Sequence, residues 1–374
     1  MHSSDLFIIG GGPAGLATAI LAARQGLSVA VADHSRPPID KTCGEGLMPD
    51  TLAGLKTLGI GIGVDEAAPL RGIRFRDADN LTRVEAQFTR GFGVGLRRTR
   101  LHAKLVERAA ALGVALLWGS RVTFAGNGQV FCEDRPVHSQ WVIGADGERS
   151  PSRKWAALAR TRYEHIRFAA RQHFRIAPWS DFVEVYWARD CQIVVAPIAP
   201  DEVCVGVTSR SPRLRLREAV TQVPALAHRL RDLSGSDNAR GARAAFRRLE
   251  RVYRGRFALV GDASGSVDPL TGEGLGLGFK QAAALVNAIQ QNDLQRYQAA
   301  HDRMGRAPRL MSRLMLMMDA HPHLRHRTLR ILAAEPSLFS GLLKLNVGEV
   351  TLSQFGVGHA LRFGWRMLNP GWEL

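Results

Sequence analysis

The stretch between residues 6 and 33 constrains the fold of this chain most, because it combines strand, turn, helix and strand signals in one run. It begins with four apolar residues, Leu6–Ile9, which are typical of a buried parallel strand. Three glycines follow at G-x-G-x-x-G spacing, namely Gly10, Gly12 and Gly15. The sequence then predicts a helix over Ala17–Arg24 and a second strand over Leu27–Ala32, so the whole stretch predicts a βαβ unit.

The glycines and the acid at the end of this unit predict a dinucleotide site. Gly10 allows a tight turn, Gly12 lets the backbone approach a pyrophosphate, and Gly15 lets the helix pack closely on the strand. The first N–H groups of the helix then face the anion. Asp33 follows where an acid binds a ribose hydroxyl group, which favours FAD or NAD over NADP. A glycine-rich turn without a ligand is the alternative.

Charge and composition limit the classes of partner. The chain has 374 residues, enough for two domains or one large one, and a formal charge of +16 from 50 basic and 34 acidic residues. Such a charge is compatible with nucleic acid, an anionic membrane surface or anionic substrates. The arginines are scattered along the sequence and no common nucleic-acid-binding motif occurs, so we expect no nucleic-acid partner.

Cysteine spacing and hydropathy point to an ordinary reduced protein. The four cysteines show neither a CxxC pair nor metal-ligand spacing; they are Cys43, Cys132, Cys191 and Cys204. We therefore expect no metal site and a cytoplasmic location. The sequence enters its first strand almost at once, which leaves no room for a signal peptide. It contains no apolar run long enough to predict a transmembrane span.

Two further glycine segments follow apolar strands. One is the run Trp141–Gly147, in which the strand ends at GADG, and the other is Phe257–Val260, which leads to Gly261 and Asp262. A loop with Pro269 and several glycines and then a long helix follow. As at the N-terminus, a helix start faces an anion and a carboxylate accepts hydrogen bonds from hydroxyl groups. Asp262 as an ordinary helix N-cap is the alternative.

The remaining segments predict a β-rich middle and a helical end. Period-two alternation predicts strands between Ile166 and Ser209. The amphipathic, Arg-rich stretches Arg213–Arg231 and Ala242–Glu250 predict surface helices. From Asp293 to Leu374 the Met- and Leu-rich sequence predicts helices that pack on their own protein. Lining a lipophilic channel and peripheral membrane contact through these C-terminal helices are the alternatives.

Three motifs carry a family resemblance: GGGPAG, GADGERSPSRK and GDASGSVDPLTGEGLGLGF. In this order they resemble the FAD-dependent superfamily that contains the p-hydroxybenzoate hydroxylases, the geranylgeranyl reductases and the flavin-dependent halogenases. KTCGEGLMP and DPLTGEG look more like the geranylgeranyl reductase branch. The aromatic YxWxFP motif of those reductases keeps only its proline in Gln192–Pro197, and the WxWxIP motif of the halogenases is absent.

The resemblance implies an α/β fold. Its core is a Rossmann-like FAD-binding domain of the glutathione reductase type 2 class, with an inserted mixed β-sheet substrate domain and a helical C-terminal region. We expect residues 1–70, 96–160 and 252–295 to form the FAD-binding domain. Residues 71–95 and 161–251 then form the substrate-binding sheet, and residues 296–374 form the helical region.

The resemblance also implies FAD as the cofactor and a set of residues that bind it. These are Gly10, Gly12, Pro13, Ala14, Gly15, Asp33, Arg98, Asp146, Gly147, Gly261, Asp262, Pro269, Gly272, Gly274 and Leu275. In this assignment Asp33 binds the adenosine ribose, Asp262 binds the ribityl chain, and the loop after Pro269 faces the flavin ring. N–H groups at the following helix start stabilise negative charge on the reduced ring. Arg97 is the alternative to Arg98.

With no Ser–His–Asp, zinc or P-loop arrangement in the sequence, we assign the chemistry to the flavin. The leading hypothesis is a monooxygenase that uses NAD(P)H and O2 on a lipophilic aromatic or polyketide-like small molecule. NAD(P)H docks transiently, or a separate flavin reductase supplies the electrons. The alternatives are a geranylgeranyl-reductase-like flavoenzyme that reduces isoprenoid double bonds, and a flavin-binding or membrane-surface protein without turnover.

Three residues are candidates for catalysis. Cys43 lies in a glycine-rich loop, CGEG, which we expect close to the bound nucleotide because glycines allow close backbone approach. A plain surface connection is the alternative for this loop. Arg171 and His173 are two residues apart and so lie on one side of a strand. A solvated sheet face explains them equally well, and the sequence shows no partner for His173.

Overall fold

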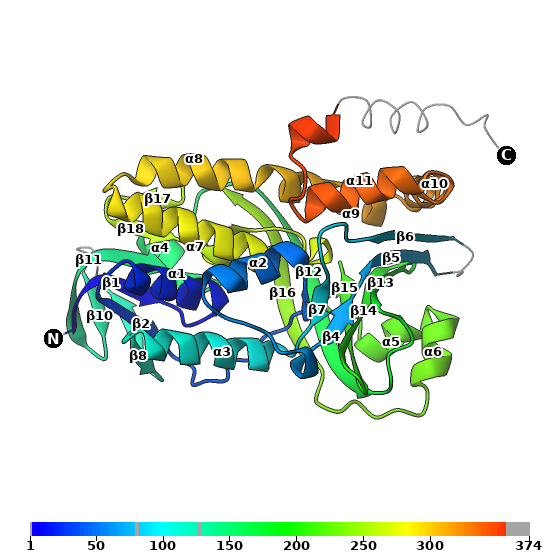
Figure 1. Cartoon of the computed structure of the whole chain (residues 1–374), viewed down its shortest axis with the longest axis horizontal. Coiled ribbons are helices and arrows are strands. Elements are labelled where there is room, and N and C mark those ends of the chain that lie inside the picture. Colours follow the sequence, from blue (N-terminus) through cyan, green and yellow to red (C-terminus); the bar gives the residue numbers. More distant parts are fainter. Residues whose placement is uncertain (1, 79–81, 126–128, 357–374) are drawn as a thin grey trace.

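The computed structural model describes residues 2–78, 82–125 and 129–356, which fold into three β-sheets covered by helices (Figure 1). The first sheet contains the βαβ unit, formed by β1 (His2–Ile9), α1 (Pro13–Arg24) and β2 (Val29–Asp33). Its parallel strands lie in the order β18 (Phe257–Leu259), β11 (Arg135–Gly144), β1, β2 and β8 (Ala115–Trp118). Three shorter strands extend it: β9 (Val122–Phe124), β10 (Val130–Cys132) and β17 (Tyr253–Arg254). The predicted Rossmann-like core is confirmed.

Helix α1 begins at Pro13, four residues before the predicted start. Proline at the first helical position has its φ preset for a helix and lacks an N–H that would go unpaired there. Gly15 brings the helix onto the strand, because a Cβ at this residue would overlap the carbonyl oxygen of Gly10. The helix therefore lies directly above the turn that follows β1.

The second sheet is mixed and has the strand order β19-β16-β12-β15-β14-β13-β5-β6. Its strands are β5 (Gly72–Asp77), β6 (Arg83–Gln87), β12 (Thr161–Arg175), β13 (Phe182–Trp187), β14 (Cys191–Ala199), β15 (Glu202–Ser209), β16 (Arg240–Leu249) and β19 (Gly265–Ser266). Only β13 and β5 pair in parallel. A third sheet holds three short strands, β3 (Gly46–Leu47), β4 (Ala68–Leu70) and β7 (Gly93–Gly95).

The predicted surface helix over Ala242–Glu250 is wrong, because this segment lies within strand β16. It pairs antiparallel with β12 from Thr161 opposite Leu249 to Arg171 opposite Arg240. Arginine, alanine and leucine favour helices in isolation, but the long β12 strand offers this segment a full ladder of backbone hydrogen bonds. The Arg213–Arg231 stretch does contain two short helices, α5 (Leu216–Thr221) and α6 (Pro224–Leu230).

Helices cover both faces of the second sheet (Figure 1). Helices α5 and α6 pack on one face, and three C-terminal helices pack on the other: α9 (Arg306–Ala320), α10 (Pro322–Ala334) and α11 (Pro336–Asn346). The remaining helices are α2 (Pro49–Thr57), α3 (Arg98–Ala111), α4 (Pro151–Trp155), α7 (Gly274–Gln290) and α8 (Leu294–Met304). Short 3-10 turns are η1 (Val64–Glu66), η2 (Gly261–Ser264) and η3 (Pro269–Thr271).

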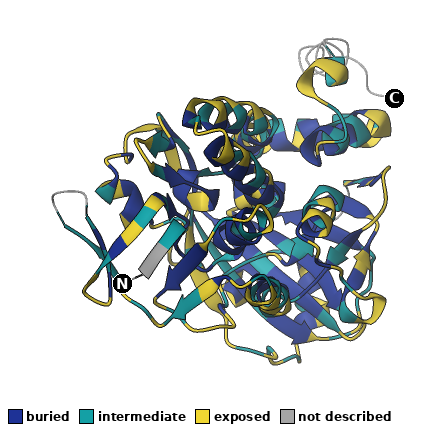
Figure 2. Ribbon diagram, turned by 60° about the vertical axis from the view of Figure 1, so that its left-hand side comes forward, coloured by how far each residue is buried: buried dark blue, intermediate teal, exposed yellow. Residues whose placement is uncertain are grey.

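The predicted helical C-terminal region is confirmed up to Asn346, while residues 357–374 of that prediction lie outside the described part of the chain. Figure 2 shows buried residues concentrated in the strands and on the inward sides of the helices. Among the described residues, no helix combines the length and apolar character needed to cross a membrane.

Candidate functional site

The N-terminus of α1, at the end of the turn after β1, faces open space without a side-chain cap. Helix α1 has Gly12 as its N-cap, without a side-chain cap and without an acid in its first turn. A Cβ at Gly12 would meet no atom within 4 Å. Gly10 has φ +116°, and a Cβ there would overlap the backbone of Ala145. The fold therefore requires Gly10, whereas the space beside Gly12 suits an anionic ligand at the helix N-terminus.

Asp33 shapes the same turn. Its Oδ2 accepts a hydrogen bond of 2.8 Å from the Gly11 N–H, and its Oδ1 accepts one of 2.8 Å from the Ser35 N–H. The carboxylate is buried at the end of β2. Because each carboxylate oxygen accepts more than one hydrogen bond, Asp33 retains capacity for a ribose hydroxyl group.

The second and third motifs are tied together by Arg153. Its Nε donates to the Ala263 carbonyl at 2.8 Å, and its guanidinium also donates to the Asp262 carbonyl at 2.9 Å. Asp146 accepts hydrogen bonds from the backbone N–H and hydroxyl of Ser152, and Gly147 has φ +81°. The sequence places Arg153 in the middle motif but gives no sign of this bridging role.

Asp262 does not cap a helix. The residue that precedes η2 is Val260, and no side-chain cap bond forms there, so the N-cap alternative for Asp262 is wrong. The side chain is exposed to solvent, yet surrounding protein raises the pKa of its carboxyl, while the positive charges of Arg98 and Lys41 act to lower it. A carboxylate that is accessible but closely surrounded is well placed to contact a bound ligand.

The N-terminus of α7, like that of α1, has no side-chain cap. Its N-cap, Glu273, makes no side-chain cap bond, and the first turn contains no acid. Gly272 adopts φ +69° just before it, and a Cβ there would press on the Met48 side chain. Gly274 is exposed at the first helical position. The helix therefore offers unpaired N–H groups beside the loop that begins at Pro269.

Two neighbouring arginines at the start of α3 have different partners. Arg97 forms an ion pair of 2.5 Å with Glu202 and approaches His173 Nδ1 at 2.8 Å. The Arg98 Nε is buried and has no hydrogen-bond partner within the described part of the chain. Arg98 therefore fits the predicted contact with a cofactor better than Arg97 does, because a buried donor without a partner is costly unless a ligand satisfies it.

His173 lies at the centre of a buried polar cluster. Its Nε2 is 2.6 Å from Glu45 Oε2, and its Nδ1 is 2.8 Å from Asp237 Oδ2. Arg171 lies 2.9 Å from the same Nδ1 and donates to Asp237 at 2.7 Å. Arg171 is 1% exposed and His173 is 0% exposed, so a solvated sheet face does not account for them.

Glu45 links this cluster to the glycine-rich loop and to α3. It is a buried non-glycine residue with φ +59°, a strained conformation that the surroundings must enforce. Its Oε1 accepts a hydrogen bond of 2.9 Å from the Arg98 N–H at the N-terminus of α3, and its Oε2 faces His173. Glu45 therefore fixes the loop, the start of α3 and strand β12 relative to one another.

Cys43 joins the cluster through Cys204. The Cys204 thiol of β15 lies opposite His173 in the sheet and donates a weak hydrogen bond of 3.7 Å to the Cys43 carbonyl. Burial, followed by the negative charge of Glu45, raises the pKa of the Cys204 thiol well above its usual value. Cys43 is half-buried, and its Sγ accepts from the Glu45 N–H at 3.4 Å. The structure thus brings the three catalytic candidates, Cys43, Arg171 and His173, together.

Two carboxylates contact His173, and Asp237 is more exposed than Glu45, with 26% of its side chain accessible. Burial acts to raise the pKa of Asp237, but hydrogen bonds from the backbone and ring of His173 and from Arg171 outweigh it and hold the pKa below its usual value. Sequence analysis did not identify Asp237, Glu202 or Arg97 as members of this cluster. Besides the predicted Arg171 and His173, Glu45 gave a signal, because it lies in the glycine-rich loop.

Glu45, His173 and Cys204 also approach one another closely enough to share a metal ion, with ligand atoms within 4.8 Å. The Nδ1 of His173, however, contacts guanidinium groups of both Arg97 and Arg171. Each of these guanidinium groups is in turn paired with a carboxylate, Arg97 with Glu202 and Arg171 with Asp237.

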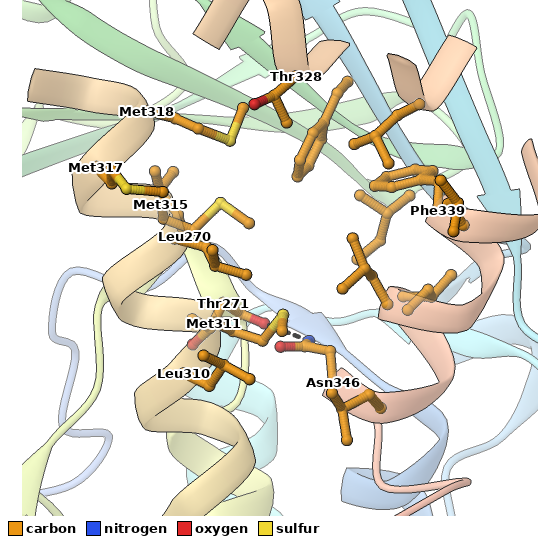
Figure 3. Close-up of a pocket in the computed structure, with 18 of the residues that line it drawn as sticks. Leu270, Thr271, Leu310, Met311, Met315, Met317, Met318, Thr328, Phe339 and Asn346 are labelled. Carbon is orange, nitrogen blue, oxygen red and sulfur yellow. Dashed lines mark hydrogen bonds between the residues drawn. The ribbon is translucent and has the colours of Figure 1, made fainter. Parts of the chain in front are cut away.

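An apolar cavity of about 250 Å³ lies between the second sheet and the C-terminal helices (Figure 3). Figure 3 shows methionine and leucine side chains of α9 on one side of it and side chains of α11 on the other. Leu270 and Thr271, from the loop that begins at Pro269, form part of its wall. Asn346 donates to the Thr271 carbonyl at 2.9 Å and is one of the few polar groups there.

These features together fit FAD: two helix N-termini without caps, carboxylates where ribose and ribityl hydroxyls are expected, and a buried arginine donor without a partner. Residues 3–292 match the family model described as the FAD binding domain. The chain belongs to this family of FAD-binding flavoproteins. The predicted superfamily and cofactor are therefore confirmed.

The flavoprotein is similar to curated enzymes over most of its length. A menaquinone reductase of Mycobacterium tuberculosis is 27% identical over 345 residues, which cover 84% of each chain. A 6-methylpretetramide 4-monooxygenase of Streptomyces rimosus is 25% identical over 403 residues, covering 93% of each chain. A flavoprotein/dehydrogenase from Cytophaga hutchinsonii has the same fold, with a TM-score of 0.81, 16% identity, and coverage of 98% of this chain and 99% of that one. The flavoprotein is an FAD-dependent oxidoreductase.

Proposed function

We propose that this flavoprotein oxygenates a lipophilic aromatic or polyketide-like small molecule that binds in the cavity between the second sheet and helices α9 to α11. One observation carries the proposal: the walls of this cavity are almost entirely apolar, and they include Leu270 and Thr271 of the loop that we assign to the flavin ring. An apolar site beside the redox centre selects a lipophilic substrate and excludes water from the reaction.

FAD supplies electron transfer to oxygen and substrate when it is bound. In our proposal the N-terminus of α1 binds its pyrophosphate, with Asp33 on the adenosine ribose and Asp262 on the ribityl chain. The N–H groups at the start of α7, next to Gly272, stabilise negative charge near the ring. Arg98 contributes its unpaired Nε and Arg153 holds the Asp262 segment in position.

The polar cluster around His173 manages a proton in this proposal. Insertion of one oxygen atom of O2 into a C–H bond, with NAD(P)H as donor, consumes a proton and releases the second oxygen atom as water. His173 bridges Glu45, which is buried, and Asp237, which reaches solvent, so the three side chains form a path for a proton. Arg171 donates a hydrogen bond to Asp237, and Cys43 lies on the loop that Glu45 fixes. Electrons come from transiently docked NAD(P)H or from a separate flavin reductase.

A reductase that saturates isoprenoid double bonds is the second candidate. It is favoured by the similarity to a menaquinone reductase over 84% of both chains, and by cavity walls in which methionine and leucine prevail over aromatic residues. Flexible aliphatic walls accommodate an aliphatic chain as readily as a fused ring system. In this case the enzyme consumes NAD(P)H but no oxygen.

The experiment that separates these activities measures oxygen uptake and product together. The FAD-loaded protein is incubated with NADPH or NADH and with 6-methylpretetramide or menaquinone, the compounds named in the two relatives. Oxygen consumed in equal amount to an oxygenated product supports the monooxygenase. A reduced product that also forms without oxygen overturns it in favour of the reductase. Bound FAD that NAD(P)H and an added flavin reductase both fail to reduce overturns both activities.

A further inference from the structure

One face of helix α9 carries an exposed stripe of alternating basic and apolar residues. Arg306, Leu310, Arg313 and Met317 are all exposed and follow one another at intervals of four, three and four residues. This spacing places them on a single side of the helix. Leu310 is 38% exposed and Met317 is 41% exposed, and because they share one side of the helix they form a common apolar strip.

The same stripe borders the apolar cavity. Leu310 and Met317 line the cavity together with other side chains of α9 (Figure 3). Part of each side chain remains accessible to solvent, so the cavity reaches the surface along α9. Leu352 is also exposed, and it lies three residues before Phe355, which lines the cavity as well. Half of the six exposed large apolar side chains of the described residues therefore belong to this C-terminal region.

The surroundings of this opening are basic. Between residues 306 and 346 the sequence has seven arginine and lysine residues and two acidic residues. Of the seven, Arg306, Arg313 and Arg330 are exposed, whereas Arg325 is buried. One of these acids, Asp319, is buried and forms an ion pair with Arg210 at 3.2 Å, so it adds little negative charge to the surface. Helices α9, α10 and α11 lie together at one side of the molecule, and α5 and α6 lie on the other face of the sheet (Figure 1).

We propose that the α9 stripe docks the flavoprotein on an anionic lipid bilayer, so that the lipophilic substrate passes from the membrane directly into the cavity. Apolar side chains enter the boundary between headgroups and acyl chains, and neighbouring arginines bind anionic headgroups. Charge complementarity selects an anionic bilayer. This inference rests on the proposed function only where it treats the cavity as the substrate site, because binding to the bilayer needs no turnover.

Flotation of the full-length, FAD-loaded protein with lipid vesicles tests this proposal. Vesicles of phosphatidylcholine mixed with phosphatidylglycerol should carry the protein upward, and vesicles of phosphatidylcholine alone should carry much less. Added salt should lower binding to the anionic vesicles, because it screens the arginines. Arg306→Glu with Arg313→Glu should lower the partition coefficient at least about tenfold, since each basic side chain near an anionic surface contributes about 1 kcal/mol. Leu310→Asp with Met317→Asp should also abolish flotation.

A control with the same change in net charge is Arg215→Glu with Arg231→Glu, two exposed arginines beside α5 and α6. This variant should float nearly as well as the unaltered protein. Failure of the unaltered protein to float with anionic vesicles overturns the proposal, as does an equal loss in the control and in the α9 variants. The content of bound FAD serves as the folding check for every variant. Flotation without oxidoreductase activity would support the docking surface and contradict the proposed function. Oxidoreductase activity without flotation would support the proposed function and contradict the docking surface.

Discussion

The Nε2 atom of His173 lies 2.6 Å from Oε2 of Glu45, and both side chains are buried, although the residues are 128 positions apart in the sequence. Glu45 belongs to the loop that precedes β3, whereas His173 belongs to β12 of the second sheet. The pair therefore joins the part of the chain that we assign to the cofactor to the sheet that faces the substrate cavity.

Removing one member of this pair should destabilise the protein strongly. His173→Leu leaves the buried Glu45 carboxylate with the Arg98 N–H as its remaining close partner, and we expect the free energy of unfolding to fall by about 3 kcal/mol. Glu45→Gln should lower the free energy of unfolding by less than His173→Leu does, because an amide carries no charge to be buried. In the double variant the loss in free energy of unfolding should be at least about 1 kcal/mol smaller than the sum of the losses in the two single variants. Urea unfolding measures all three losses. Additive single effects would mean that the two residues do not interact energetically.

Two glycines of the first motif should behave differently when changed to alanine. Gly12→Ala should leave the thermal stability of the FAD-free protein nearly unchanged, because its φ is −73° and its Cβ would meet no atom. The restriction of the unfolded chain by alanine offsets its poorer propensity for the N-cap position. It should nevertheless weaken FAD binding at least about tenfold, since the new methyl group fills the space of the pyrophosphate. Fluorescence titration with FAD measures the affinity.

Gly10→Ala is the matched comparison in the same loop. Because its φ is +116° and a Cβ would overlap the backbone of Ala145, this change should lower the stability of the FAD-free protein itself. Equal FAD affinity for Gly12→Ala and the unaltered protein would show that the pyrophosphate lies elsewhere.

His301 should make stability depend on pH in mildly acidic solution. Burial lowers the pKa of this histidine to about 4, and its Nε2 lies 2.9 Å from the Ser264 hydroxyl. Because the unfolded chain binds a proton more readily than the folded one, stability is fully present above the unfolded pKa of 6.5 and is lost as pH falls towards 4. The loss should amount to roughly 3 kcal/mol. His301→Gln should flatten the pH dependence of urea unfolding in this window, and an unchanged slope would exclude His301 as its source.

Filling the apolar cavity should block lipophilic ligands without affecting FAD. Leu342→Trp adds bulk to the cavity wall, whereas Ala333→Trp places the same side chain on an exposed position of α10 outside the lining. The affinity for the neutral dye N-phenyl-1-naphthylamine should fall at least about tenfold in the first variant and stay unchanged in the second. Dye binding that is equal in both variants would place the lipophilic site elsewhere.

The sequence contains enough information for the FAD-binding core because each step of the βαβ unit is local. The apolar run, the glycines and Asp33 lie within one stretch, and each has its own conformational or chemical requirement. The helix predicted over Ala242–Glu250 is wrong for the opposite reason, because the structure of this segment depends on a distant part of the chain. Its residues favour a helix locally, and only pairing with the distant β12 makes it a strand.

The cluster around His173 could be predicted only in part. The two-residue spacing of Arg171 and His173 does place them together, as the structure has it. Asp237 comes from an irregular segment 64 positions away, and Glu202 from the neighbouring strand, so no periodicity connects them with His173. For the C-terminal helices the sequence leaves the lining of a lipophilic channel as an alternative, because amphipathic helices that line a pocket have the same pattern as helices that pack on a core.

The central claim, a flavin-dependent oxidoreductase that acts on a lipophilic substrate, is tested most directly by following the flavin absorption of the purified protein. NADPH or NADH is added without oxygen, alone and with a catalytic amount of flavin reductase, and oxygen is then admitted with substrate present. We predict a yellow protein whose flavin absorption bleaches on reduction and returns with oxygen as product forms. A colourless protein that cannot be reconstituted with FAD would contradict the account.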